Sequence, residues 1–212
     1  IKSFFNIEDE KKIKYYFPEL YGQRGYVIKG QEHAKGSSKG DLKEFFHIGN
    51  PVISNPKNVW PIEVVDFEKI GTEAYLTLES IGLTILESIA IYLGLEKKYF
   101  TDKVKGGESI MRSIHYYPLN ENDVQDGAVR AAAHGDINLI TLLMGASADG
   151  LEIFTKDKKW IPIISEPDQL VINVGDMMER LTNKRLMSTV HRVVNPDISK
   201  LNTSRYSIPF FM

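Results

Sequence analysis

Val129-Arg-Ala-Ala-Ala-His-Gly-Asp-Ile137 is the stretch that decides the fold. Within it, His134 and Asp136 are separated by a single residue. In an extended chain, residues i and i+2 project from the same face, so both side chains can reach one point. A third candidate ligand, His191, lies in Met187-Ser-Thr-Val-His-Arg-Val-Val194, a β-branched run that predicts a strand.

Two imidazoles and one carboxylate form an informative set of metal ligands. On one face of a metal they make the facial triad of non-haem Fe(II) sites, which leaves positions open for a co-substrate and O2. Zinc fits less well, because catalytic zinc sites hold a four-coordinate geometry with a single open position. We therefore predict that His134, Asp136 and His191 bind Fe(II).

A second motif, Arg205-Tyr-Ser207, lies in an apolar run near the end of the chain. Arg205 and Ser207 share one face of the predicted strand. A guanidinium binds a carboxylate through two parallel hydrogen bonds, and a hydroxyl adds a further one. The pair therefore predicts an anion site, with an internal ion pair from Arg205 to Asp176 or Glu179 as the alternative.

The order His-x-Asp, a distant His and then Arg-x-Ser resembles the isopenicillin N synthase-like branch of the Fe(II)/2-oxoglutarate-dependent dioxygenases. The resemblance covers most of the chain. It includes Gly150-Leu-Glu-Ile-Phe154, Trp160-Ile-Pro162, Asn173-Val-Gly-Asp176 and His191-Arg-Val-Val-Asn-Pro196.

The resemblance implies an enzyme that uses Fe(II), with 2-oxoglutarate as co-substrate and ascorbate as a candidate reductant. It implies release of succinate and CO2 while a small organic molecule is hydroxylated, desaturated or cyclised. Arg205 and Ser207 would hold the co-substrate. Tyr117, in Ile114-His-Tyr-Tyr-Pro118, resembles the family's Asn-x-Tyr segment, which contacts the 2-oxo acid. Here His115 replaces the usual Asn, and both side chains are expected on the inner face.

Helices are expected first and strands later. The predicted elements before residue 109 are a helix over 1–17, a loop over 21–39, a short helix over 41–47 and a long helix over 66–95. Eight short strands follow, at 110–117, 129–134, 139–144, 151–155, 160–164, 170–174, 187–194 and 204–211. This order predicts an α+β fold with a mainly β core: a double-stranded β-helix, or jelly roll, flanked by N-terminal helices.

Length and composition favour one domain over residues 1–212, with a mostly helical part over 1–108 and a jelly-roll catalytic core over 109–212. The chain has no cysteine, which excludes disulfides and thiolate catalysis. A net charge of −2 gives no sign of nucleic acid or an anionic membrane as partner. The partners expected are a small-molecule substrate and O2, for a cytoplasmic monomer. Because the chain starts at Ile1 and stops directly after an apolar strand, we expect both ends to be cut.

Several polar residues outside the motifs are weaker candidates. The glycine-rich loop 25–39 is a candidate cover for the substrate, with Tyr26 and Glu32 as contacts. Arg130 is in phase with His134 and could reach the substrate end of the site. His33 and His47, in or beside loops, are interpreted as non-functional.

Two other functions remain open at this point. Isopenicillin N synthase and aminocyclopropane-carboxylate oxidase keep the Arg-x-Ser motif without using 2-oxoglutarate, so this chain could be such an oxidase. The other alternative is a jelly-roll binding module without a catalytic metal. The residues leave the primary substrate undefined.

Overall fold

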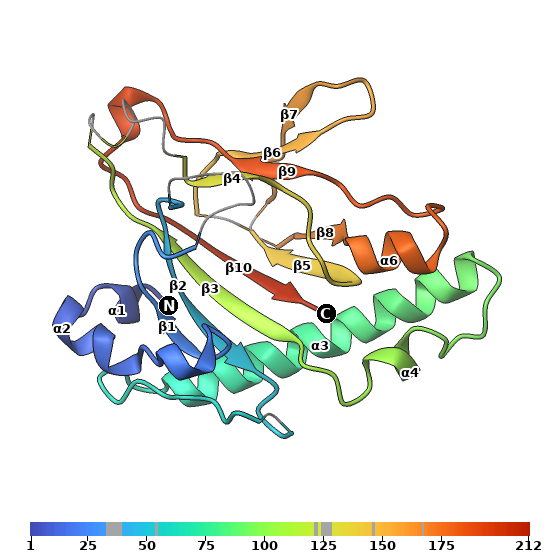
Figure 1. The fold of residues 1–212 in the computed structure, drawn as a ribbon, viewed down its shortest axis with the longest axis horizontal. Coiled ribbons are helices and arrows are strands. Elements are labelled where there is room, and N and C mark those ends of the chain that lie inside the picture. The colour runs from blue at the N-terminus through green and yellow to red at the C-terminus, as the bar shows by residue number, and fades with distance from the viewer. Residues whose placement is uncertain (33–39, 54, 121–122, 124–128, 146, 167) are drawn as a thin grey trace.

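Two antiparallel sheets form the body of the protein (Figure 1). The computed structural model describes residues 1–32, 40–53, 55–120, 123, 129–145, 147–166 and 168–212. The larger sheet contains, in order, β1 (Gly25–Val27), β2 (Glu44–Gly49), β3 (Ile110–Tyr116), β10 (Arg205–Phe211), β5 (Ile140–Met144) and β8 (Leu170–Val174). The smaller sheet contains β4 (Ala131–His134), β9 (His191–Val193), β6 (Leu151–Phe154) and β7 (Trp160–Pro162). This is the mixed α+β jelly roll that the sequence predicted.

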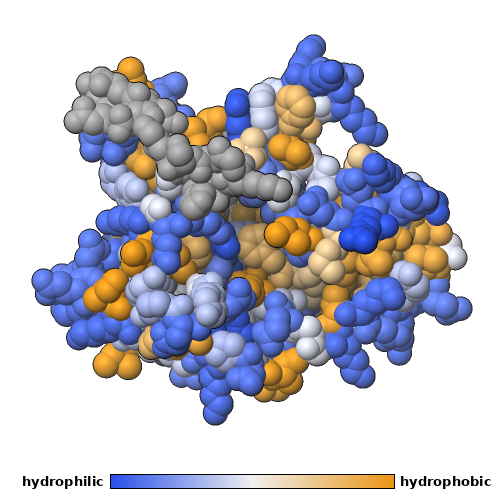
Figure 2. All heavy atoms as spheres, in the orientation of Figure 1, coloured by the Kyte–Doolittle hydropathy of each residue, from blue (hydrophilic) through white to orange (hydrophobic). Residues whose placement is uncertain are grey.

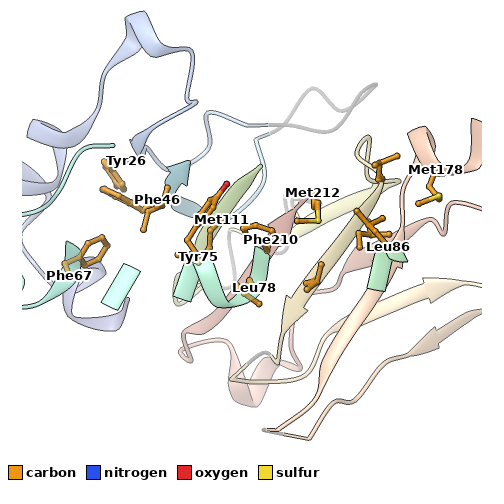
Figure 3. Close-up of a cluster of buried hydrophobic side chains, with 14 of the residues drawn as sticks. Tyr26, Phe46, Phe67, Tyr75, Leu78, Leu86, Met111, Met178, Phe210 and Met212 are labelled. Carbon is orange, nitrogen blue, oxygen red and sulfur yellow. The ribbon is translucent and has the colours of Figure 1, made fainter. Parts of the chain in front are cut away.

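Helix α3 (Phe67–Tyr92) packs along the outer face of the larger sheet (Figure 1). Its buried residues recur every three or four positions, as a helix with one apolar face requires: Tyr75, Leu78, Gly82, Leu86 and Ala90. The helix closely matches the one predicted over 66–95. A side chain at Gly82 would lie 2.8 Å from the Met212 sulfur, so a glycine is needed for this close approach. In Figure 3 the face of α3 meets Phe210 and Met212 from β10 and the residue after it.

The short helices lie at the edges of this core. They are α1 (Lys2–Phe5), α2 (Asp9–Lys12), η1 (Ile13–Tyr15), η2 (Pro18–Leu20), α4 (Thr101–Val104), α6 (Asp176–Leu181) and η3 (Ile198–Lys200). The prediction of a single helix over 1–17 is therefore wrong. Phe4 packs edge-on against Tyr15, Tyr26 and Phe46, and the chain must break to bring these rings together. Helix α6 was missed because it has only six residues and buries only Met178.

The prediction of a helix over 41–47 is also wrong, because this segment leads into strand β2. Phe46 and Ile48 face the α3 side of the sheet, whereas Phe45 belongs to the cluster on the other side. With both faces covered, all six residues of β2 are buried, and the alternation that signals a strand is lost. Strand β1 lies in the expected loop over 21–39. The larger sheet thus takes two strands from residues 1–108 and continues across the expected boundary at 108/109.

A buried carboxylate ties the amino-terminal segment to the sheet. Glu44 on β2 is fully buried and receives the Lys12 ammonium at 2.9 Å and a hydrogen bond from the Tyr26 hydroxyl. Its other oxygen is 2.7 Å from Nδ1 of His115 on β3. The Nε2 of His115 lies 2.9 Å from the hydroxyl of Ser204, the residue before Arg205. Such a buried charge is tolerated only because every partner is present.

Candidate active site

The three predicted metal ligands come together at one end of the strand pair β4 and β9. His134 ends β4, His191 begins β9, and the two residues are paired across the strands. Asp136 follows β4 by two residues, as the i, i+2 argument expected. One ligand atom from each of the three residues lies within 4.8 Å of the others, so all three can bind one ion. His134 is exposed, whereas Asp136 and His191 are buried.

Neighbouring groups orient each ligand atom. Nδ1 of His134 donates to the Ala132 carbonyl at 2.7 Å, and Nδ1 of His191 donates to the Thr189 carbonyl at 3.1 Å. These contacts leave Nε2 of both rings as the free donor atom for a metal. Thr141 donates to Oδ2 of Asp136 at 2.8 Å, which leaves Oδ1 directed toward His191, 3.7 Å from its Nε2.

The electrostatics also suit a metal. Although His134 keeps part of its surface in solvent, the surrounding protein removes much of the hydration of its ring, which lowers its pKa, and the neighbouring His191 lowers it further. Both effects favour the neutral, metal-binding form of this imidazole. Two imidazoles and one carboxylate with fixed ring orientations fit Fe(II), because three protein ligands leave coordination positions open for a co-substrate and O2.

The predicted anion site lies in a cavity shared with the triad. Arg205 is 1% exposed, and its Nε donates to the carbonyls of Ala148 and Asp149 at 3.1 and 3.2 Å. Nη1 lies 3.5 Å from the Ser207 hydroxyl. Among the described residues, no carboxylate lies within ion-pair distance of Arg205, so the expected alternative of a pair with Asp176 or Glu179 is absent there. The Tyr116 hydroxyl accepts from the Arg205 side chain, and no described carboxylate competes with an incoming anion for the guanidinium.

The interpretation that Tyr117 and His115 face the cavity is wrong. On β3 the inward residues are Arg112, Ile114 and Tyr116, and Tyr116 pairs with Arg205 across the strands. The Tyr116 ring centre lies 4.9 Å from Cζ of Arg205. His115 points to the opposite face, where it stacks on Tyr206.

Tyr117 lies beyond the end of β3, in a different environment. It packs against a cluster of Leu42, Leu119 and Leu201, with the Lys29 ammonium 5.2 Å from its ring centre. Sequence reasoning missed Tyr116 because adjacent tyrosines are distinguished only by the strand register. Tyr116 could have been identified from its spacing, because it alternates with Arg112 and Ile114 on the same face of β3, and that face lines the cavity.

A larger cleft of about 890 Å³ opens beside the triad. His134 and Asp136 form part of its wall, and Leu139, Met177 and Phe211 make part of it apolar. Figure 2 shows this face of the molecule hollowed, with hydrophobic residues toward its centre. A pocket with an apolar lining and a few polar groups is typical of a small-molecule site.

The polar part of this cleft was largely missed from the sequence. It includes Glu32, Asp41, Lys43, His47 and Arg112. Glu32 was expected to contact substrate from the loop 25–39, and it does line the cleft. Burial opposes ionisation of Glu32, but the charges of Arg112 and Lys43 outweigh it and lower the pKa of its carboxyl to about 2.

Other candidates from the sequence lie elsewhere. Tyr26 faces the core and donates to Glu44, so it does not contact the cleft. Arg130 is buried, and its Nη2 donates to the Thr203 carbonyl at 2.7 Å, away from the substrate end where it was expected. His33 and residues 34–39 of the expected covering loop lie outside the described residues. His47 lies on β2 and faces the cleft.

Comparison with known proteins identifies the same family along the whole chain. Residues 107–212 match the model of the 2OG-Fe(II) oxygenase superfamily, and residues 1–63 match that of the non-haem dioxygenase in morphine synthesis N-terminal family. A putative 2OG-Fe(II) oxygenase family protein from Caulobacter crescentus is 44% identical, with a TM-score of 0.86 over 100% of this chain and 70% of that one. A full-length Neurospora crassa protein, solved in complex with alpha-KG, is 29% identical, with a TM-score of 0.87 over 99% of this chain and 68% of that one.

Curated relatives agree with this assignment. The proline hydroxylase buaE of Petromyces alliaceus is 32% identical over 99% of this chain and 70% of its own length. The chain spans 63% of the 2-oxoglutarate-Fe(II) type oxidoreductase hxnY of Emericella nidulans, at 29% identity. It spans 65% of the oxidoreductase ppzD of Metarhizium rileyi, at 32% identity. These relatives are thus longer than the chain described here.

Proposed function

Because the chain belongs to the 2OG-Fe(II) oxygenase superfamily, we propose that it is an Fe(II)- and 2-oxoglutarate-dependent oxygenase of a small organic molecule. One observation carries the proposal: His134, Asp136 and His191 line the same cavity as Arg205 and Ser207. The candidate metal site and the candidate anion site therefore share one cavity.

When bound, Fe(II) with 2-oxoglutarate and O2 supplies an oxidative decarboxylation, which yields succinate and CO2 and oxidises the second substrate. The protein contributes binding and orientation. Arg205, fixed through its Nε, would hold the distal carboxylate of 2-oxoglutarate, with the Ser207 hydroxyl beside it. Thr141 and the carbonyls of Ala132 and Thr189 keep the three ligands in place. The apolar wall at Leu139 and Phe211 would exclude water.

The test is anaerobic titration of the Fe(II)-loaded protein with 2-oxoglutarate. The proposal expects a metal-to-ligand charge-transfer band, and succinate when O2 is admitted. No band and no succinate would exclude 2-oxoglutarate as co-substrate. Iron binding without a band would favour the same-fold oxidase. A folded protein that retains no metal, and whose stability His134→Ala does not change, would favour a binding module.

We further propose a cytoplasmic monomer that needs neither nucleic acid nor a membrane. Helix α3 is long and apolar enough to span a membrane by length and composition alone. Its face at Tyr75, Leu78 and Leu86 packs on the sheet, which supports a core role. The formal net charge of −2 supports the absence of a polyanionic partner. Sedimentation equilibrium tests the oligomeric state, and a mass of about twice 24.1 kDa would contradict it.

A further inference from the structure

Two cations in the larger cleft share a single carboxylate oxygen. Oε2 of Glu32 lies 2.7 Å from the Lys43 ammonium and 2.9 Å from Nη1 of Arg112. Lys43 also contacts Asp41 at 2.9 Å. One oxygen with two cationic donors at these distances defines a position where a carboxylate fits well.

The two cations are held rigidly. The guanidinium of Arg112 lies over the rings of Phe45 and Phe211, at 4.2 and 5.3 Å from their centres. Nε of Arg112 donates to Nε2 of His47 at 2.6 Å, so Nε2 of the His47 ring is the acceptor. Nδ1 of His47 donates to the Gly22 carbonyl. The ammonium of Lys43 is held by Asp41, whose own position is fixed by a hydrogen bond from the Ala132 amide at 3.3 Å. This arrangement is preorganised, so a ligand would bind with little further ordering.

The position lies within reach of the metal ligands. Lys43 and Arg112 line the large cleft together with His134 and Asp136. They also line the smaller cavity that contains Arg205. Ala132, which is tied to Asp41, lies on β4 two residues before His134. A substrate held at Lys43 and Arg112 would therefore have the rest of its body beside the metal site.

Glu32 differs from the other members of the cluster. Its side chain is 36% exposed, whereas those of Lys43 and Asp41 are 7% and 6% exposed. It can therefore turn into solvent while the cations stay in place. Once Glu32 turns away, Arg112 keeps its hydrogen bond to His47. The His47 ring is neutral, because burial and the charge of Arg112 lower its pKa to about 3. Asp41 still pairs with Lys43, so the charge left without a counter-ion is that of Arg112, and this charge needs an anion from outside.

We propose that Lys43 and Arg112 recognise a carboxylate on the primary substrate, and that Glu32 occupies its place in the unliganded protein. This inference rests on the proposed function, because it assigns the substrate class of the same site. A cationic substrate fits poorly, since it would meet Lys43 and Arg112 directly. In the displacement, one carboxylate replaces another on the same two donors, so few hydrogen bonds are lost.

The experiment uses the protein loaded anaerobically with Fe(II) and saturating 2-oxoglutarate, which occupies the Arg205 site. Calorimetry measures binding of three matched probes: phenylacetate, phenylacetamide and phenethylamine. We expect phenylacetate to bind at least tenfold more tightly than either of the others. Equal binding of the three, preference for the amide or amine, or no binding of phenylacetate at millimolar concentration would overturn the inference.

Variants assign the effect to residues. Arg112→Gln should weaken phenylacetate binding at least tenfold and leave phenylacetamide binding and the 2-oxoglutarate charge-transfer band unchanged. Glu32→Gln should strengthen phenylacetate binding several-fold, because the competing internal carboxylate is gone. Lys103→Met is the matched control, since Lys103 lines the cleft from α4 with its ammonium 4.4 Å from the Tyr99 ring centre. It should change none of the three affinities.

The outcomes separate this inference from the proposed function. A wild-type protein without the charge-transfer band contradicts the proposed function. A normal band with no preference for the acid contradicts only the carboxylate assignment. Should Arg112→Gln misfold, as circular dichroism would reveal, the comparison of Glu32→Gln with wild type decides alone. Loss of the band in a folded Arg112→Gln variant would place 2-oxoglutarate itself on Arg112 and overturn the inference.

Discussion

Arg205 and Arg112 both line a cavity shared with the triad, Arg205 fully buried and Arg112 half-buried, but their positive charges are balanced differently. Neutral backbone carbonyls of Ala148 and Asp149 hold Arg205, and no described carboxylate pairs with it. The carboxylate of Glu32 pairs with Arg112. The first arrangement keeps an anion site permanently ready, as an obligatory co-substrate requires. The second neutralises the Arg112 charge until a particular ligand arrives, so an empty site is not left with an unpaired, half-buried cation.

The largest expected effect removes the element that the two arginine sites share. Asp136→Ala deletes the only carboxylate of the triad, and iron affinity should fall more than ~100-fold, since even indirect contacts to a metal ligand contribute ~10- to 100-fold. Metal analysis after desalting measures this effect. Circular dichroism should report an unchanged fold. A variant that retains one iron per chain would show that the triad is not the metal site.

Exchanging each arginine for lysine tests the contrast itself. Arg205→Lys should raise the KM for 2-oxoglutarate ~10- to 100-fold, because a point charge replaces a two-pronged donor. Arg112→Lys is the matched control and should leave that KM within ~2-fold. Succinate formation at varied 2-oxoglutarate gives both values. Equal effects of the two exchanges would mean that the sites are not specialised in this way.

A smaller effect is expected where a neutral group holds a ligand in place, as the carbonyls hold Arg205. Thr141→Val keeps the shape of the side chain but removes the hydroxyl that donates to Asp136. Iron affinity should fall ~10-fold, within the range for such outer contacts. Competition with a chelator of known affinity measures the change. Thr155→Val, on the exposed β6–β7 turn, is the control and should leave iron affinity unaffected.

The smallest expected effect concerns the stability that Glu32 contributes. Its pKa of about 2 in the folded protein lies below the ordinary 4.5, so its contribution is present above pH ~4.5 and is lost as the pH falls toward 2. Because the side chain is partly exposed, screening limits this contribution to ~1 kcal/mol. Urea unfolding of wild type and Glu32→Gln should differ by that amount at pH 7, and the difference should disappear as the pH approaches 2. A difference independent of pH would contradict the ion-pair explanation.

The two arginine sites also differ in whether they could be predicted from the sequence. His134, Asp136, Arg205 and Ser207 are grouped by alternation within single strands, a local rule that needs no knowledge of the fold. Likewise, the α3 pattern is repeated over enough turns to be unambiguous. These features rest on short spacings along the chain.

The Arg112 site could not be found in this way. Its members come from β2, the residues just before β2, β3 and the segment before residue 33, and they meet because His47 pairs with Arg112 across two strands. That register is fixed by packing of Phe46 and Ile48 under α3, which sequence spacing does not encode. The wrong prediction of Tyr117 in place of Tyr116 has the same origin, because a shift of one residue in strand register moves every side chain to the other face of the sheet.

Glu44 has a practical consequence for anyone redesigning this protein. Its lysine partner comes from the twelfth residue, so trimming the first short helices would leave an acid in the interior without its cation. The damage would pass through the histidine and serine beyond it to the start of the strand that carries Arg205. A shortened scaffold would need a hydrophobic replacement for Glu44 before it could be expected to keep its co-substrate pocket.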